Sequence, residues 1–162
     1  MTKKPLLWAF VLSSLAGTAM HFAYNVLPIP LVGLLAPVSE SVWEHLKLLY
    51  WPFLVASALV ARRKADPLRW WSGALAALLL QPLVLTGLYY LLKTGFGVES
   101  LWVDIGLYYA VMALGFFTAY RLERTCRAMP FVGLLIVLAA VYGVSLMAFS
   151  LAAPSLPIFT AP

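Results

Sequence analysis

Charged residues are scarce in this 162-residue chain, and their scarcity excludes an ordinary soluble globule. Only 10% of the residues are charged, whereas 64% are hydrophobic and the mean hydropathy is +0.94. A typical soluble domain has about 25% charged residues and about 45–50% apolar residues. The composition therefore predicts an integral membrane protein whose main partner is the lipid bilayer.

The chain has a single cysteine and none of the standard catalytic motifs. Cys126 is the single cysteine, so no intrachain disulfide can form. The chain has no His-Glu-x-x-His, no Gly-x-Ser-x-Gly, no pair of Cys-x-x-Cys and no phosphate-binding glycine loop. The net charge of +5 could suggest nucleic acid, but the basic residues flank hydrophobic runs, where they act as topology signals. We expect no nucleic-acid partner.

Five apolar segments are long enough to cross a bilayer, which takes about 20 helical residues. They are residues 5–27, 41–61, 70–92, 101–122 and 130–152. The first could instead be a cleaved signal peptide, but its apolar run continues past Ala16–Ala19, the candidate cleavage site. The prediction is one all-α domain over 1–162, an integral membrane bundle of five transmembrane helices with no soluble domain.

The distribution of basic residues predicts the orientation. With a cytoplasmic N-terminus and five crossings, the cytoplasmic side would carry nine of the 11 basic residues: Lys3, Lys4, Arg62, Arg63, Lys64, Arg69, Arg121, Arg124 and Arg127. Only Lys47 and Lys93 would lie toward the other side. The positive-inside rule therefore predicts a multi-pass protein of the cytoplasmic membrane with its N-terminus inside and its C-terminus outside.

The segment between the first two spans is apolar but rich in helix-breaking residues. Pro28–Pro37 contains three prolines and one glycine and is too short to cross a bilayer. We expect a loop at the outer interface rather than a helix.

Most unusual is the polar cluster that follows this segment. Glu40, Glu44, His45 and Lys47 fall within eight positions, although ionisable groups near a bilayer are costly. Part of the cluster has a structural explanation, because a helix starting at Ser39 or Ser41 would use Ser41 and Glu44 as a capping box. Lys47 lies three residues beyond Glu44, close enough to pair with it.

A functional explanation rests on helix periodicity. Glu40, Glu44 and Lys47 would share one helix face, with His45 on an adjacent face. Small and polar residues also form a stripe on the first span, ending in His21 and Asn25. A third set lies on the fourth span; its members are Asp104, Tyr108, Gly115 and Thr118.

These stripes predict one outward-facing polar cavity. The candidate ligand- or ion-binding residues are His21, Asn25, Glu40, Glu44, His45, Lys47, Asp104 and Tyr108. Imidazoles and carboxylates suit zinc, manganese or similar ions. The candidate ligands for a divalent metal ion are His21, Glu44, His45 and Asp104.

Two stretches carry a family resemblance. His21-Phe-x-Tyr24 is followed by Gly33-Leu-Leu-Ala-Pro-Val-Ser-Glu-Ser-Val-Trp-Glu-His-Leu-Lys-Leu-Leu-Tyr-Trp-Pro52. They resemble a family of small uncharacterised bacterial polytopic membrane proteins with a Pro-Val-Asn-Glu-Ser-Val-Trp-Glu-His-Leu-Lys signature, in which Ser39 replaces the asparagine. The resemblance covers about the first third of the chain. It implies that Glu40, Trp43, Glu44, His45 and Lys47 act as a unit, and it implies no particular activity.

Three functions fit these observations. The first is binding or transport of a cation, either a proton or a divalent metal, with a conducting path requiring a homo-oligomer or a partner membrane protein. The second is a non-catalytic membrane subunit, assembly factor or sensor. The third is a membrane-embedded metal-dependent hydrolase in which a carboxylate serves as general base. Five helices in 162 residues would make a small transporter, and of the three functions the enzyme is the one we favour least.

Overall fold

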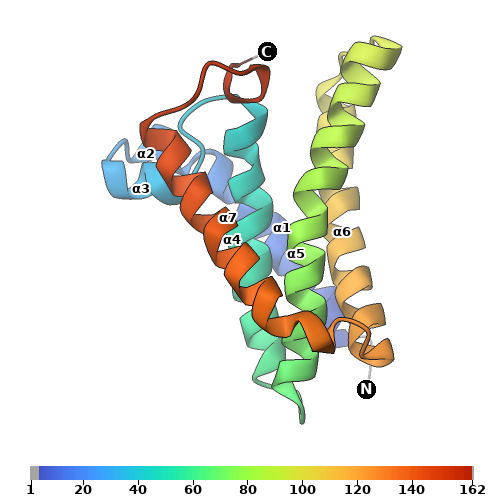
Figure 1. The fold of residues 1–162 in the computed structure, drawn as a ribbon. Coiled ribbons are helices and arrows are strands. Elements are labelled where there is room, and N and C mark those ends of the chain that lie inside the picture. Colours follow the sequence, from blue (N-terminus) through green and yellow to red (C-terminus); the bar gives the residue numbers. More distant parts are fainter. Residues whose placement is uncertain (1–3, 162) are drawn as a thin grey trace.

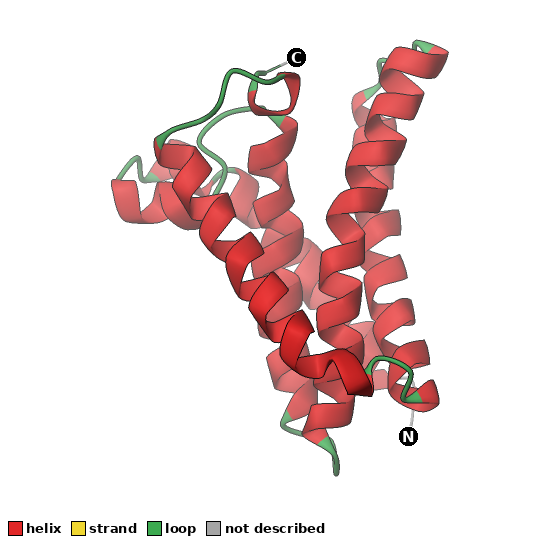
Figure 2. Ribbon diagram, in the orientation of Figure 1, coloured by secondary structure: helices red, strands yellow, loops and turns green. Residues whose placement is uncertain are grey.

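The computed structural model describes residues 4–161 and is all-helical over them, as predicted (Figures 1 and 2). Its long helices are α1 (Lys4–His21), α4 (Val42–Ala61), α5 (Pro67–Tyr90), α6 (Leu101–Thr125) and α7 (Val132–Leu151). Its short elements are α2 (Ala23–Val26), α3 (Pro30–Leu35), the π-helical turn η1 (Leu91–Gly95) and the 3₁₀ turns η2 (Met129–Phe131) and η3 (Pro157–Phe159). No strand occurs within residues 4–161.

The long helices form one bundle in which neighbours along the chain are antiparallel. α5 contacts α4, α6 and α7, and α1 packs against α4 and α6 (Figure 1). One end of the bundle therefore collects the start of α1, the α4–α5 connection and the end of α6. The predicted clustering of basic residues at one end follows from this order. We call it the basic end and the opposite one the pocket end.

An ion pair fixes the basic end. The Lys64 Nζ lies 2.6 Å from Glu123 Oε1 and 4.7 Å from the centroid of the Trp70 ring. Arg69 Nε donates to the Glu123 backbone carbonyl at 2.8 Å. These contacts join the start of α5 to the end of α6.

Large side chains fill the core of the bundle from the basic end toward the pocket end. Phe53, Trp70, Met112 and Leu146 are fully buried, and the indole of Trp70 donates to the Ser57 carbonyl at 2.9 Å. Burial of each such side chain stabilises the fold by roughly 1.5–3 kcal/mol. The outward faces of the helices are apolar as well as exposed, which is the pattern of a lipid-facing surface.

Three helical stretches are long and apolar enough to cross a membrane. They are Pro67–Gly95, Leu101–Thr125 and Met129–Leu151. They correspond to the predicted third, fourth and fifth spans. Crossing by α1 and α4 stays a prediction, since neither helix has a stretch of 18 residues that is as apolar as those three.

The structure corrects two predictions near the pocket end. The first span was expected to run to Leu27, but α1 ends at His21 and a separate short helix follows a break at Phe22. The segment expected to be a loop contains α3, because Pro30 occupies the first turn of that helix, where proline has no hydrogen bond to lose.

Candidate functional site

The start of α4 places the polar residues of the cluster. Ser41 has an extended backbone and is the N-cap residue, and its hydroxyl accepts a hydrogen bond from the Glu44 backbone N–H at 3.3 Å. This confirms the predicted helix start. Glu40 lies before the helix, so it does not follow the α4 periodicity and does not share a face with Glu44 and Lys47. The prediction that these three share one face is wrong for Glu40 for this reason.

His45 is oriented by the backbone of its own helix. Its Nδ1 lies 2.8 Å from the Ser41 carbonyl oxygen. A carbonyl oxygen only accepts, so Nδ1 carries a proton, and Nε2 is the ring nitrogen that faces Glu40. Histidines that bind metals are commonly held in this way by a hydrogen bond to the other ring nitrogen.

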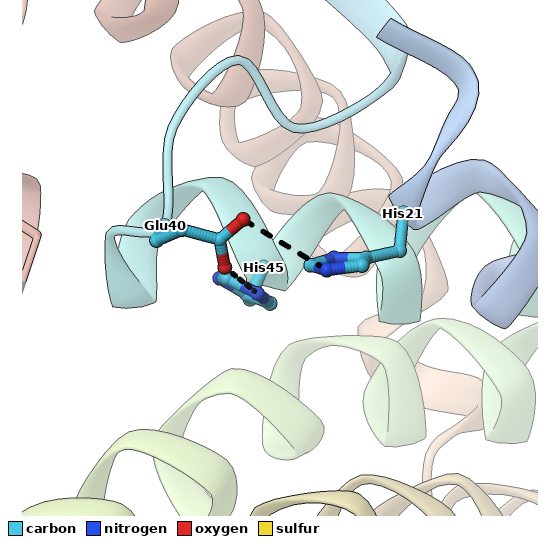
Figure 3. A group of neighbouring side chains, drawn as sticks. All are labelled: His21, Glu40 and His45. Carbon is cyan, nitrogen blue, oxygen red and sulfur yellow. Dashed lines mark ion pairs between the residues drawn. The ribbon is translucent and has the colours of Figure 1, made fainter. Parts of the chain in front are cut away.

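Three ligand-type side chains converge at this point from three segments: His21 at the end of α1, Glu40 in the loop, and His45 in the first turn of α4 (Figure 3). Glu40 Oε2 lies 3.4 Å from His45 Nε2, and Glu40 Oε1 lies 3.8 Å from His21 Nε2. The two imidazole centroids are 5.1 Å apart. We call these three residues the His–Glu–His cluster.

The spacing of the cluster is close to that of a metal site. One ligand atom from each residue lies within 4.8 Å of the others. Ligands at about 2.1 Å in a tetrahedral zinc site are about 3.4 Å apart, so the widest pair must close by up to about 1.4 Å. Glu40 is 67% exposed on a loop, and the imidazoles are 28% and 30% exposed, which leaves them room to move.

The cluster opens into a pocket of about 350 Å³ between α1, α4, α5 and α6. Its polar walls come from Thr18, Tyr89, Lys93, Asp104, Tyr108 and Tyr109. Its apolar walls come from Phe22, Val42, Leu48, Leu85, Ile105 and Leu107. The cluster therefore has space beside it for more than a water molecule.

Glu44 and Lys47 belong to a different, buried network. Lys47 Nζ donates to Glu44 Oε2 at 2.7 Å and to the carbonyls of Gly33 at 2.7 Å and Ala36 at 3.2 Å. The other carboxylate oxygen of Glu44 accepts from the Ser150 hydroxyl at 2.7 Å. Lys47 is 0% exposed and has three bonds for its three donors.

This network explains why the fold needs both charges. Glu44 Oε2 also accepts from the Val38 backbone N–H at 2.9 Å, so the pair joins the segment after α3 to α4 and α7. The predicted pairing of Lys47 with Glu44 is confirmed. The Glu44 carboxylate is directed into this network and lies outside the His–Glu–His cluster, whereas Glu40, absent from the predicted metal set, lies within it.

The remaining candidates have different positions. Asp104 is exposed near the start of α6 and lines the pocket opposite the cluster. Tyr108 lines it too, and its hydroxyl lies 3.2 Å from the Ser14 carbonyl of α1 and 3.4 Å from the Leu48 carbonyl of α4. Asn25 is exposed on α2, beyond the break that ends α1, and does not line the pocket.

Sequence reasoning missed Tyr89 and Lys93 as parts of the pocket. Lys93 Nζ donates to the Tyr89 hydroxyl at 3.0 Å, one turn back along α5 and η1. Their spacing of four residues, which places both side chains on one helix face, was the only hint in the sequence. It could be recognised as part of the site only once α5 was placed opposite α1 and α4.

Comparison with known proteins shows the family. The model of a family of unknown function, DUF6512, matches residues 1–161, so the chain belongs to that family. No curated protein and no solved structure matches the chain. Membership agrees with the resemblance to an uncharacterised family and assigns no activity.

Proposed function

We propose that this DUF6512 protein is a five-span membrane protein that binds a divalent metal ion, with zinc as the best fit, at His21, Glu40 and His45. The observation that carries the proposal is the convergence of these three side chains within 4.8 Å from three separate segments. Two imidazoles and one carboxylate form a ligand set found in zinc enzymes, in which a fourth position stays open.

The setting of the cluster supports this proposal. The bond from His45 Nδ1 to the Ser41 carbonyl aims Nε2 toward Glu40. The three prolines of the preceding segment and the Lys47 network fix the loop that carries Glu40. A site held in this way loses less conformational entropy on binding an ion.

Binding fits the geometry better than conduction does. The cluster lies at one end of the bundle, and Phe53, Leu78 and Met112 fill the middle at 0–1% exposure. Transport would require rearrangement of this core or a path between copies of the chain. With the basic end cytoplasmic by the positive-inside rule, the site would face the outside of the cell.

The test is zinc binding by protein purified without a histidine tag, measured by isothermal titration calorimetry and elemental analysis. We expect one zinc ion per chain. Loss of a residue that only supports a metal ligand typically weakens metal binding about 10–100-fold. Loss of a ligand itself should weaken it at least as much, so we expect this for His21→Ala, Glu40→Gln and His45→Ala.

Glu99→Gln is the matched control for Glu40→Gln. Glu99 is an exposed glutamate at the same end of the bundle but lies outside the cluster. Its substitution should leave zinc affinity unchanged. Folded wild-type protein that binds no zinc, manganese or other divalent ion would overturn the proposal, as would equal affinity in wild type and all three cluster variants.

A further inference from the structure

The pocket beside the His–Glu–His cluster has its charged groups at one end and mixed walls along its depth. Charged and imidazole groups lie at its outer rim: His21, Glu40, His45, Lys93 and Asp104. Hydroxyl groups lie about one helical turn deeper: Thr18, Tyr89, Tyr108 and Tyr109. Apolar side chains line both levels, with Phe22, Val42 and Ile105 near the rim and Leu48, Leu85 and Leu107 deeper.

Helix geometry sets this order. α5 and η1 present Leu85, Tyr89 and Lys93 at intervals of four residues, about 6 Å each, along one face toward the rim. α6 runs the opposite way, so its Asp104 lies at the rim and its Leu107 lies about one turn below. The charged residues of these antiparallel helices therefore lie at the same end of the pocket.

The hydroxyl groups of the middle level bond partly to one another and partly to backbone carbonyls. The Thr18 hydroxyl and the Tyr109 hydroxyl are 3.1 Å apart, which joins α1 to α6 at the pocket wall. The Tyr108 hydroxyl is directed to backbone carbonyls of α1 and α4. These bonds join α6 to α1 and α4 at the pocket wall.

A bound metal ion and Lys93 would both attract an anion at the rim. Among residues 4–161, Lys93 forms no ion pair; its ammonium group contacts the Tyr89 hydroxyl. A divalent ion and Lys93 would together balance the carboxylates of Glu40, Asp104 and the neighbouring Glu99. A metal ion held by three protein ligands also keeps a coordination position for an anionic oxygen.

We propose that this pocket binds a single-chain amphiphile with an anionic phosphate or carboxylate head group. The head group would lie between the His–Glu–His cluster and Lys93, and the hydrocarbon chain would lie against Leu48, Leu85 and Leu107. The volume of about 350 Å³ is near the lower end of the range for small-molecule sites and suits one chain. This inference rests on the proposed metal site and adds the class of its second ligand.

The experiment compares three probes on zinc-loaded wild-type protein in nanodiscs of a neutral lipid. Octyl phosphate has the head and the chain, inorganic phosphate has the head alone, and octanol has the chain alone. We expect octyl phosphate to bind at least about tenfold more tightly than either of the other two by calorimetry. Equal affinity for octyl phosphate and inorganic phosphate would overturn the amphiphile proposal and leave a simple anion site.

Two variants locate the ligand. Lys93→Met should weaken the binding of octyl phosphate about tenfold, since hydrogen bonds to charged groups contribute on that scale. The binding of octanol should be unchanged. Ile105→Trp places a bulky ring at the partly exposed pocket wall and should abolish octyl phosphate binding. Lys4→Met, the same change as Lys93→Met at the basic end, is the control and should behave as wild type.

Zinc titrations of the same samples separate the two proposals. Both Lys93→Met and Ile105→Trp should bind zinc as wild type does, which also shows that they are folded. If both variants bind zinc and also bind octyl phosphate as tightly as wild type does, the pocket proposal is contradicted and the metal proposal is not. Absence of zinc binding in wild type would contradict the metal proposal, and with it the head-group site proposed here.

Discussion

At the scale of single residues, two neighbouring polar groups have separate tasks. Glu44 and Lys47 are buried and bonded to each other, whereas Glu40 and His45 border the pocket. Ser41 ends the extended loop and starts α4, which leaves Glu40 off the helix, and the helix turn directs His45 away from Glu44 and Lys47. The polar residues from Glu40 to Lys47 thus divide between a buried network and the pocket rim.

Replacing Lys47 by methionine should destabilise the protein strongly. The change leaves the Glu44 carboxylate buried without its cation, and breaking a buried ion pair in this way costs about 3–5 kcal/mol. Thermal unfolding of the purified protein measures the loss. Lys93→Met is the control, because Lys93 lies at the pocket rim; a melting temperature for Lys47→Met equal to that control would contradict the structural role of the pair.

The residue types of the site were predictable, but their grouping was not. His21, His45 and Lys47 were identified because ionisable groups stand out in an apolar chain. Helix periodicity assigned Glu44 to the metal set and failed for Glu40, because periodicity does not apply to a residue before the N-cap. The contacts of Lys47 with Gly33 and Ala36 depend on the path of the α3 segment, which the sequence does not specify.

At the scale of helices, close approach depends on glycine at specific positions. A Cβ on Gly17 of α1 would overlap the Tyr108 hydroxyl of α6 and lie 2.7 Å from the Leu48 carbonyl of α4. Gly17 therefore allows α1 to touch both neighbours at the depth of the pocket. Close packing of this kind explains the predicted stripe of small residues on the first span at Ser14 and Gly17, which are buried.

Gly17→Ala should destabilise the bundle by about 1–3 kcal/mol, the usual cost of overpacking a core. Gly106→Ala on α6 is the matched control, because a Cβ there meets nothing within 4 Å. That variant should be as stable as wild type or slightly more so, given the higher helix propensity of alanine. Equal melting temperatures for the two variants would show that α1 does not pack as described.

At the scale of the whole molecule, the antiparallel order of five long helices separates the two ends by charge. Nearly all basic residues of the described chain lie at the basic end, and the His–Glu–His cluster lies at the pocket end. The number of long helices was predictable from hydropathy, to within a few residues at most ends. The break after His21 and the short helix α3 were not, since local backbone geometry and packing against α7 decide them.

Cysteine labelling in intact cells tests this orientation. In a Cys126→Ser background, Thr94→Cys lies at the pocket end and should react with a membrane-impermeant maleimide. Ala65→Cys lies in the α4–α5 connection at the basic end and should react only after the cells are permeabilised. The reverse pattern would contradict a cytoplasmic basic end, and labelling of both in intact cells would contradict a spanning bundle.

X-ray absorption at the zinc K-edge of the zinc-loaded, tag-free protein tests the central claim most directly. A site at His21, Glu40 and His45 predicts two imidazole nitrogens at about 2.0–2.1 Å with carboxylate and other oxygen ligands completing the shell. The imidazole scattering should fall by half in His45→Ala. A spectrum without imidazole ligands, or one identical in wild type and His45→Ala, would contradict the metal site.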